Sequence, residues 1–427
     1  MQLERREFLA ALASLAVADL LPAADAPAWL PATAYAVPKE TTNQGSGYFS
    51  IVAGLDGKLY IGCAKYGVNA YLVEFDPATS KMKIAVDCMK EIGSEAKGFA
   101  AQAKIHTRNN VGPSGKIYFA TKQGYPEKDE KRSDYPGGYP MVYDPKTGKA
   151  RVYPIPIPQQ GIISIWPDEA RDVAYISTCD DARPVESTHF MILDLKTGKY
   201  RDLLDCQHMY SFIVCDHLGR AYHPILGGEI ARYDPKTDKV ERLKQTIDGQ
   251  PPTKESLLAD PKSHPINWDV SPDGKTLYAV AMSANQLYSY DLTGSGDTLA
   301  GKSLGKLVKD AKQTDCRALA VGPKGEVWAA VTATTALGTS ILYLVSWKPG
   351  DAEPTNHGPV SVRNPDYTEF TDKAGKPLPW HHGIRKLADG TTTTNHAILG
   401  VCQGRDDKVY ALSLAPFTLL QMTPGKK

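Results

Sequence analysis

Short runs of alternating apolar and polar residues, separated by turn-forming residues, extend along almost the whole chain. The stretch KIHTRNNVGPSGKIYFATK (104–122) alternates, turns at 113–115 and alternates again, which is the pattern of a β-hairpin. Its second half recurs as an apolar run, a turn, and a second strand with an aromatic residue near its start. Seven copies can be aligned: AGLDGKLYIG (53–62), VGPSGKIYFA (111–120), PDEARDVAYIS (167–177), CDHLGRAYHP (215–224), SPDGKTLYAV (271–280), VGPKGEVWAA (321–330) and GRDDKVYALS (404–413).

Five copies are followed by another strand that ends in an Asp turn: LVEFDPATSK, MVYDPKTGK, MILDLKTGK, ARYDPKTDK and LYSYDLTGS. Asp at such a turn accepts hydrogen bonds from its own backbone, and a following Pro presets φ. A repeat of about 40–55 residues made only of strands and turns is typical of a β-propeller. The sequence therefore predicts an all-β fold, a seven-bladed β-propeller with four-stranded antiparallel blades.

One propeller domain is expected over 27–427. The segment TAYAVP (33–38) is predicted to close the ring, because the last copy lacks an obvious fourth strand after FTLLQM. The polar region from about 351 to 395 is predicted to be an insertion between the sixth and seventh blades.

The first 26 residues have a different character and resemble an export signal. Arg5 and Arg6 precede an Ala/Leu-rich run at 8–21, and ADA at 24–26 has the small-x-small cleavage pattern. The string RREFL is similar to a twin-arginine signal. We therefore expect a signal peptide over 1–26 and a bacterial protein exported to the periplasm or the medium, with no membrane span in the mature chain.

The net charge and the cysteines of the chain disfavour several classes of partner and cofactor. The net charge of +1 does not favour nucleic acid or an anionic membrane surface, and we expect a monomer. The seven cysteines are scattered without a CxxC or CxxCH motif, which argues against c-type haem, zinc ribbons and a dense disulfide framework. Most lie in apolar strand patterns, so they are interpreted as small buried apolar residues.

Candidate chemistry gathers where the innermost strands of the blades begin. Aligning the copies on their aromatic residue places these residues level with His106: Tyr48, Gln160, Tyr210, Pro265, Cys316 and Ile398. Lys104 and His208 lie two residues earlier and Arg108 two later, on the same face by the strand period of two. Long loops at 122–140, 178–189 and 222–232 converge there and bring Lys122, His223 and Arg232.

This set suits an anionic ligand, because Arg and Lys pair with carboxylate or sulfate. β-Elimination from a uronic acid needs a base for the proton α to the carboxylate, a cation for the carboxylate and an acid for the leaving oxygen. His106 and Tyr210 are the candidate base and acid, with His208 and His223 as further candidates. Arg108, Lys122, Arg232 and Arg317 are candidates for holding the carboxylate. Polar residues in a propeller channel also serve simply to bind water, and that interpretation stays open.

On these residues the chain resembles the β-propeller polysaccharide lyases that act on ulvan and, more distantly, the oligogalacturonate lyases. The resemblance covers the whole propeller and depends on KIH at the second blade and a Tyr at the fourth. It implies that His106, Tyr210 and Arg232 are catalytic. From their place at the channel mouth, eight further residues are predicted to bind substrate: Tyr48, Lys104, Arg108, Lys122, Gln160, His208, His223 and Arg317. Where these lyases have a second His, this loop has Lys122 and Tyr125.

Three candidate functions follow from these features, and one of them is disfavoured. The first is a lyase acting on an acidic polysaccharide or oligosaccharide, and the second is a non-catalytic propeller that binds a glycan or a protein on the same face. A quinone-dependent or redox propeller is disfavoured because neither a haem motif nor a Trp-rich blade repeat is present. No cofactor is required by the sequence. A divalent metal (calcium, zinc or manganese) has candidate ligands in His381, His382, His396 and Cys402, but their spacing matches no metal motif.

Overall fold

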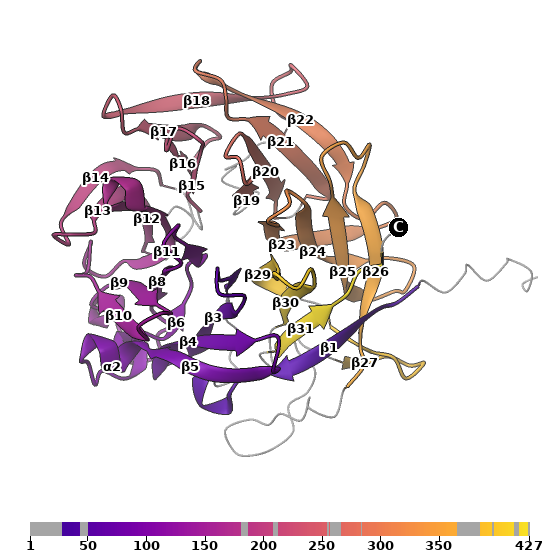
Figure 1. The fold of residues 1–427 in the computed structure, drawn as a ribbon, viewed down its shortest axis with the longest axis horizontal. Helices are drawn as coiled ribbons and strands as arrows, with labels where there is room; N and C mark the ends of the chain where they lie inside the picture. Colours follow the sequence, from indigo (N-terminus) through magenta and orange to yellow (C-terminus); the bar gives the residue numbers. More distant parts are fainter. Residues whose placement is uncertain are drawn as a thin grey trace, which may run out of the picture.

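The computed structural model describes residues 28–42, 50–180, 187–207, 212–253, 256, 266–282, 284–364, 385–394, 397–413 and 418–425. These residues form an all-β fold with the architecture of a β-propeller, whose sheets stand around a common axis (Figure 1). The predicted all-β class is confirmed. The predicted signal peptide at 1–26 lies outside the described residues.

Consecutive strands pair antiparallel into four-stranded units. The first three are β2 (Ile51–Ala53), β3 (Leu59–Lys65), β4 (Asn69–Asp76) and β5 (Lys81–Asp87); β7 (Asn110–Val111), β8 (Ile117–Lys122), β9 (Pro140–Asp144) and β10 (Lys149–Val152); and β11 (Gly161–Asp168), β12 (Val173–Cys179), β13 (His189–Asp194) and β14 (Tyr200–Asp205). The short strand β6 (Lys104–Ile105) joins the first two units, because it pairs with both β3 and β8.

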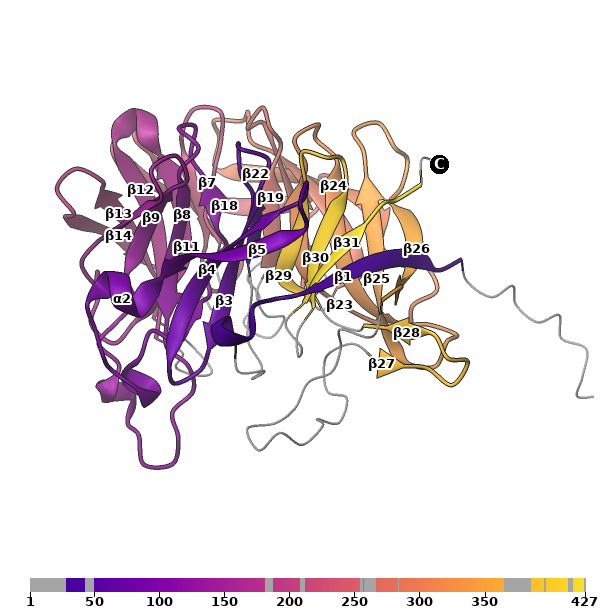
Figure 2. The same ribbon diagram turned by 60° about the horizontal axis from the view of Figure 1, so that its bottom comes forward.

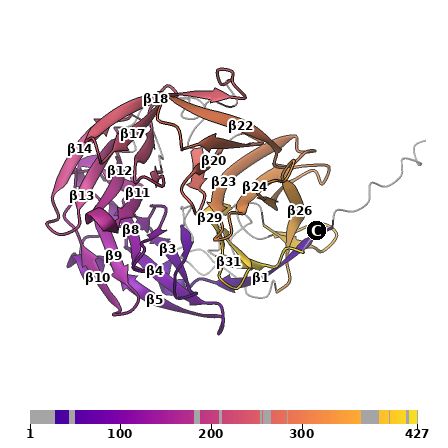
Figure 3. The same ribbon diagram turned by 45° about the horizontal axis from the view of Figure 1, so that its top comes forward.

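The next three units are β15 (Val214–Cys215), β16 (Ala221–Pro224), β17 (Ile230–Asp234) and β18 (Lys239–Ile247); β19 (Ile266–Val270), β20 (Thr276–Ala281), β21 (Gln286–Asp291) and β22 (Thr298–Lys306); and β23 (Gln313–Val321), β24 (Val327–Thr334), β25 (Ser340–Trp347) and β26 (Thr355–Val362). In the units that begin with β11, β23 and β29, the first strand lies nearer the axis than the strands that follow it (Figure 3). Residues 355–362 of the predicted insertion therefore form the outer strand β26, and 385–386 and 392–393 form the small strands β27 (Arg385–Lys386) and β28 (Thr392–Thr393) beside it (Figure 2).

The last unit joins the two ends of the described chain. It consists of β29 (Ala397–Gln403), β30 (Val409–Ser413), β31 (Thr418–Met422) and, from the other end, β1 (Leu30–Ala36). β1 pairs antiparallel with β31 from Ala32↔Met422 to Ala36↔Thr418, and its first residues run parallel to β26. The prediction that the segment near 33–38 closes the ring is confirmed.

In the part of the chain that the structure describes, helix is confined to short turns: η1 (Lys39–Thr41), α2 (Cys88–Ile92), η2 (Gly98–Ala100), η3 (Arg132–Asp134) and η4 (Glu169–Arg171). Within the described residues, no helix is long and apolar enough to cross a membrane.

Apolar side chains are buried between neighbouring units, where each sheet packs on the next. Tyr60 and Ile105 belong to the cluster between the first two units, and Tyr118 and Ile165 to the next one. The cluster around Leu59 also contains Leu412, so the β29–β1 unit packs against β2–β5 as consecutive units do. No unit can bury its faces alone, and stacking around the axis supplies the core.

Both repeated sequence features have a structural role. The Asp turns form as predicted: Asp144 Oδ1 accepts from the Lys146 amide at 2.9 Å, and Asp234 Oδ1 accepts from the Lys236 amide at 2.8 Å. The repeat aromatic residue is buried, and in several units its hydroxyl donates to a carboxylate of the inner turn, as Tyr60 does to Asp56 at 2.7 Å.

Candidate functional site

Two lysines lie directly opposite each other near the start of the second unit. Lys104 of β6 pairs with Lys122 of β8, and the two side chains are 1% and 0% exposed. Like charges at directly opposed strand positions destabilise a sheet, and burial of an ammonium group adds a large cost. Such a pair marks a place where the fold accepts a cost in stability, which is typical of a functional site.

His106 lies beside these lysines. It follows β6 by one residue, shares the face of Lys104 by the strand period, and is 1% exposed. Burial, reinforced by the positive charges of Lys122 and Lys104, holds the pKa of His106 well below its ordinary value. The imidazole is therefore neutral near neutral pH, and it binds a proton less readily than an ordinary histidine does.

This low pKa predicts a pH-dependent stability. Below about pH 6.5 the histidine of the unfolded chain takes up a proton that folded His106 does not. The free energy of unfolding should therefore fall as pH drops below that value, and this contribution should be absent from His106→Gln. Chemical unfolding at several pH values would show the wild type losing stability relative to the variant on acidification. Two parallel curves would contradict the assignment.

An aromatic pair connects the lysines with solvent. The ammonium of Lys104 lies 4.7 Å from the ring centroid of Tyr125 and 5.5 Å from that of Tyr66. The two rings are 5.5 Å apart, and Tyr125 is 56% exposed. Cation–π contacts offset part of the cost of burying Lys104, and the exposed face of Tyr125 offers an approach to the buried charges.

The loop that carries Tyr125 is held by its own hydrogen bonds. Gln102 accepts from Thr121 Oγ1 at 2.6 Å and from the Tyr135 hydroxyl at 2.9 Å, and its amide donates to the Gly137 carbonyl at 2.9 Å. Glu130 accepts from the backbone amide of Phe99 at 2.8 Å. These bonds fix the long 122–140 loop over the second unit.

Lys122 also contacts the third unit. Its Nζ lies 2.8 Å from Sγ of Cys179, at the end of β12. Gly161 pairs with Cys179, and a Cβ at Gly161 would lie 2.4 Å from Cγ of Lys122. The glycine thus leaves the space that the lysine stem occupies. The sequence did not point to Cys179, because a cysteine in an apolar strand pattern has the signature of a core residue.

Arg108 faces the central channel, where it meets the fifth unit. Its guanidinium forms an ion pair with Asp269 and donates to the Trp268 carbonyl. Both Arg108 and Asp269 line a cavity of about 240 Å³, with Asn110 and Gln403 among the other lining residues. Arg108 thus connects the second and fifth units across the channel, and Asp269 compensates its charge. This partner could not be identified from the sequence, because the two residues are 161 positions apart.

The remaining predicted residues fall into two groups. Gln160 accepts from Thr178 Oγ1 at 2.6 Å, and Arg317 is paired with Asp315 at 2.7 Å. His223 is fully buried, with Nε2 2.7 Å from Ser177 Oγ and Nδ1 2.7 Å from the Pro224 carbonyl. Tyr48, His208 and Tyr210 lie outside the described residues, so their predicted roles stay predictions.

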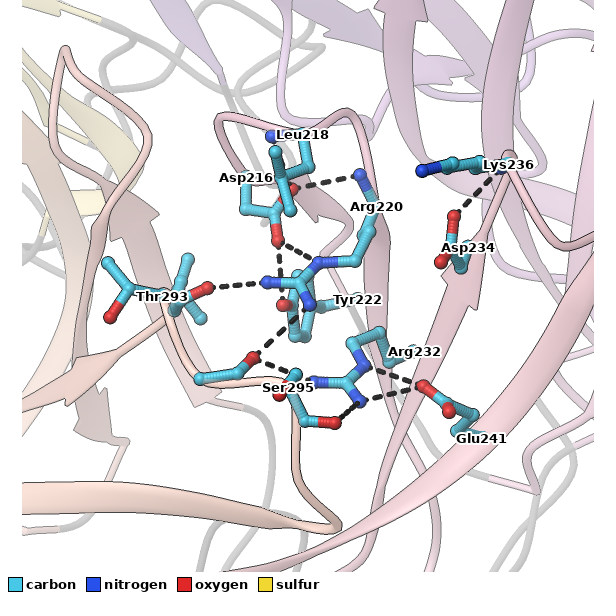
Figure 4. Close-up of polar contacts among 12 residues, drawn as sticks. Asp216, Leu218, Arg220, Tyr222, Arg232, Asp234, Lys236, Glu241, Thr293 and Ser295 are labelled. Atoms are coloured by element: carbon cyan, nitrogen blue, oxygen red, sulfur yellow. Dashed lines mark hydrogen bonds and ion pairs between the residues drawn. The ribbon is translucent and has the colours of Figure 1, made fainter.

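Arg232, predicted to be catalytic, connects two units through its side chain. It is 4% exposed and binds Glu241 at 2.7 Å and the carbonyls of Ser295 and Gly296 at 3.2 and 3.0 Å (Figure 4). Those carbonyls belong to the turn between β21 and β22, so the arginine fastens the fifth unit to the fourth. The predicted catalytic role of Arg232 stays a prediction, and these contacts give its side chain a structural role as well.

The structure tests two predictions about cysteines and metals. Six cysteines are buried and Cys215 is half-buried, all as thiols and none in a disulfide, which confirms the interpretation as small buried residues. Among the residues that the structure describes, no group of three or more His, Cys, Asp or Glu side chains could hold a metal ion. His381, His382 and His396 lie outside those residues.

Comparison with known proteins adds distant likenesses only. No protein-family model matches the sequence, and no curated protein matches it. Among solved structures, the periplasmic gluconolactonase PpgL of Pseudomonas aeruginosa is similar with a TM-score of 0.46 and 12% identity, over 88% of this chain and 99% of that one. A luciferin-regenerating enzyme is similar with a TM-score of 0.41 and 12% identity, over 75% of this chain and 92% of that one. An identity of 12% is too low to transfer the role of any residue.

Proposed function

We propose that the chain binds an acidic glycan at Lys104, His106 and Lys122 and cleaves it by β-elimination. The observation that carries this proposal is the pair of buried, directly opposed lysines beside a histidine with a lowered pKa. A carboxylate placed between the two ammonium groups would relieve their mutual repulsion and form charge-assisted hydrogen bonds with both. The site thus favours a uronate over a neutral sugar.

The elimination needs three functions, and the described residues supply two. Lys104 and Lys122 neutralise the carboxylate and stabilise the charge that develops on it when the α proton leaves. His106, held neutral, takes up that proton. The leaving glycosidic oxygen needs an acid, and Tyr210 remains our candidate for it, as the resemblance to ulvan lyases implies.

The setting of this site is part of the proposal. We take the four-stranded units to be the seven blades of one propeller, with β1 completing the last of them. We also take residues 1–26 to be a twin-arginine export signal, on the strength of RREFL and the ADA site. An exported monomer would meet acidic polysaccharides in the periplasm or outside the cell.

The proposal is tested by incubating the purified protein with a panel of acidic glycans and following ultraviolet absorbance. β-Elimination creates an unsaturated uronate that absorbs where the intact glycan does not. Neutral glycans of the same length are the control. A new reducing end without the absorbance would show hydrolysis and contradict the elimination.

A non-catalytic glycan-binding propeller is the second candidate. The lowered pKa of His106 favours it, because such an imidazole accepts a proton less readily than an ordinary histidine, whereas binding needs no proton transfer. Measurable affinity for an acidic glycan with neither absorbance nor new ends would decide for this function.

Tyr125 should matter for affinity more than for chemistry. Replacing Tyr125 by Ala removes an exposed ring that covers Lys104, and we expect KM to rise several-fold with little change in kcat. Tyr125→Phe keeps the ring and is the matched control. Steady-state kinetics on one uronate glycan would check this, and an unchanged KM in Tyr125→Ala would exclude the ring from substrate binding.

A further inference from the structure

The contact between Lys122 and Cys179 is unusually close for an amine and a thiol. Their Nζ and Sγ atoms are 2.8 Å apart, a separation ordinary for N–H···O bonds although sulfur is a larger atom than oxygen. The thiols of Cys63, Cys206 and Cys316 instead contact backbone carbonyl oxygens at 4.0, 4.0 and 3.7 Å. Cys179 therefore differs from those buried thiols in having a reactive nitrogen as its neighbour.

The two side chains are also held in place. Both residues are fully buried, and they come from neighbouring units, at the ends of β8 and β12. The stem of Lys122 packs over Gly161, where no side chain competes for the space. Two groups fixed at this distance need almost no reorganisation to react, so the effective concentration of one at the other is high.

We propose that Lys122 and Cys179 are an oxidative modification site, at which one oxygen atom bridges the lysine nitrogen and the cysteine sulfur. The ammonium of Lys122 first releases one proton to solvent. With dioxygen as oxidant, the resulting neutral amine and the thiol each lose one hydrogen and each bind the same oxygen atom. The second oxygen atom leaves as water with those two hydrogens. Dioxygen gains four electrons, two from the nitrogen and two from the sulfur. With hydrogen peroxide, two molecules are consumed and three waters are formed.

The modification would regulate the site, and this consequence rests on the proposed function. The bridge consumes the ammonium of Lys122, so the carboxylate of the substrate would lose one of its two cations. A thiol reductant restores both side chains, because the sulfur is in a low oxidation state, as in other reversible products of cysteine oxidation. An exported enzyme would then be active only while this pair is reduced.

Mass spectrometry tests the bridge directly. The folded protein is treated with hydrogen peroxide and then digested with trypsin, and the masses of the peptides are measured. We expect one cross-linked product joining the peptides of Lys122 and Cys179, heavier than their sum by one oxygen and lighter by two hydrogens. Trypsin should fail to cleave after Lys122, and dithiothreitol should restore cleavage. Sulfinic or sulfonic acid at Cys179 with Lys122 unmodified would overturn the proposal, as would two unmodified side chains.

Variants separate the bridge from the proposed function. Cys179→Ser should give no cross-link, and its glycan turnover should lose sensitivity to peroxide relative to its own untreated rate. Cys316→Ser, which changes a buried thiol in another unit, should keep the cross-link. A protein without lyase activity would still show the mass change, so failure of the proposed function and failure of the bridge are distinguishable.

Discussion

Replacing Arg220 by alanine should lower the free energy of unfolding by about 3–5 kcal/mol, the usual cost of removing one partner of a buried ion pair. The side chains of Arg220 and Asp216 are 6% and 0% exposed, and Nε lies 2.5 Å from Oδ2. The same guanidinium donates to the Leu292 carbonyl at 2.6 Å, next to the turn that Arg232 also binds (Figure 4). The variant would leave a buried carboxylate without its cation.

Urea unfolding of the wild type and Arg220→Ala measures this loss. Arg242→Ala is the matched control, since Arg242 pairs with Glu229 in the same unit, but the two side chains are 53% and 41% exposed. An exposed pair contributes roughly 0–1 kcal/mol, so the control should stay close to the wild type. Equal losses in both variants would show that burial of the Arg220 pair is not what holds the units together.

Local chemistry made much of the fold predictable. The aromatic repeat and the Asp turns are short-range patterns, and Asp144 or Tyr60 satisfies its bonds within a few residues. Ring closure by 33–38 followed from counting strands, because the last copy lacked one. Patterns that depend on contacts within a few residues can be recognised in a single sequence. A strand that is missing from one copy of a repeat can be recognised in the same way.

Register was harder to predict, because bulges are not visible in the pattern. β11 has an irregularity between Ile162 and Ser164, so Gly161, and not Gln160, pairs with Cys179. β23 has another between Cys316 and Ala318. One extra residue moves a side chain to the other face of a strand, so aligning the copies on their aromatic residue does not by itself determine which face Gln160 or Cys316 occupies.

Contacts between units could not be predicted at all. Arg108 and Arg232 were selected as cations near a channel mouth, which the sequence supports. Their partners, Asp269 for one and the carbonyls at 295 and 296 for the other, depend on how units pack. A charged residue in a repeat looks the same from the sequence whether it holds a ligand or a neighbouring sheet.

The sequence did predict that Lys104, His106 and Lys122 lie together, and the structure adds how. Lys104 and His106 are two residues apart, which places them on the same face of a strand. The second strand of the hairpin brings Lys122 back beside them. The cross-strand pairing Lys104↔Lys122 and the burial of all three side chains are new. The site is therefore shielded from solvent and contains two cations, whereas a channel rim would be hydrated. Charge interactions at such a site are stronger than in water.

Replacing His106 by glutamine should therefore lower kcat for glycan cleavage by roughly 10²–10⁴-fold, the usual contribution of a general base. Glutamine keeps a polar side chain of similar size and cannot take up the α proton, so KM should change little while Lys104 and Lys122 still hold the carboxylate. The same substitution at His189, which pairs with Asp202 at 2.7 Å in the third unit, is the control and should leave kcat unchanged.

The outcome separates catalysis from structure because three quantities can be read on one variant. Loss of kcat with an unchanged KM and an unchanged unfolding midpoint near neutral pH assigns His106 to the chemical step. A parallel loss of stability would instead mean that the imidazole only fills its buried position. If His106→Gln retains kcat within a few-fold of wild type, the base lies elsewhere. The two lysines would then form a carboxylate-binding site without the catalytic role proposed here.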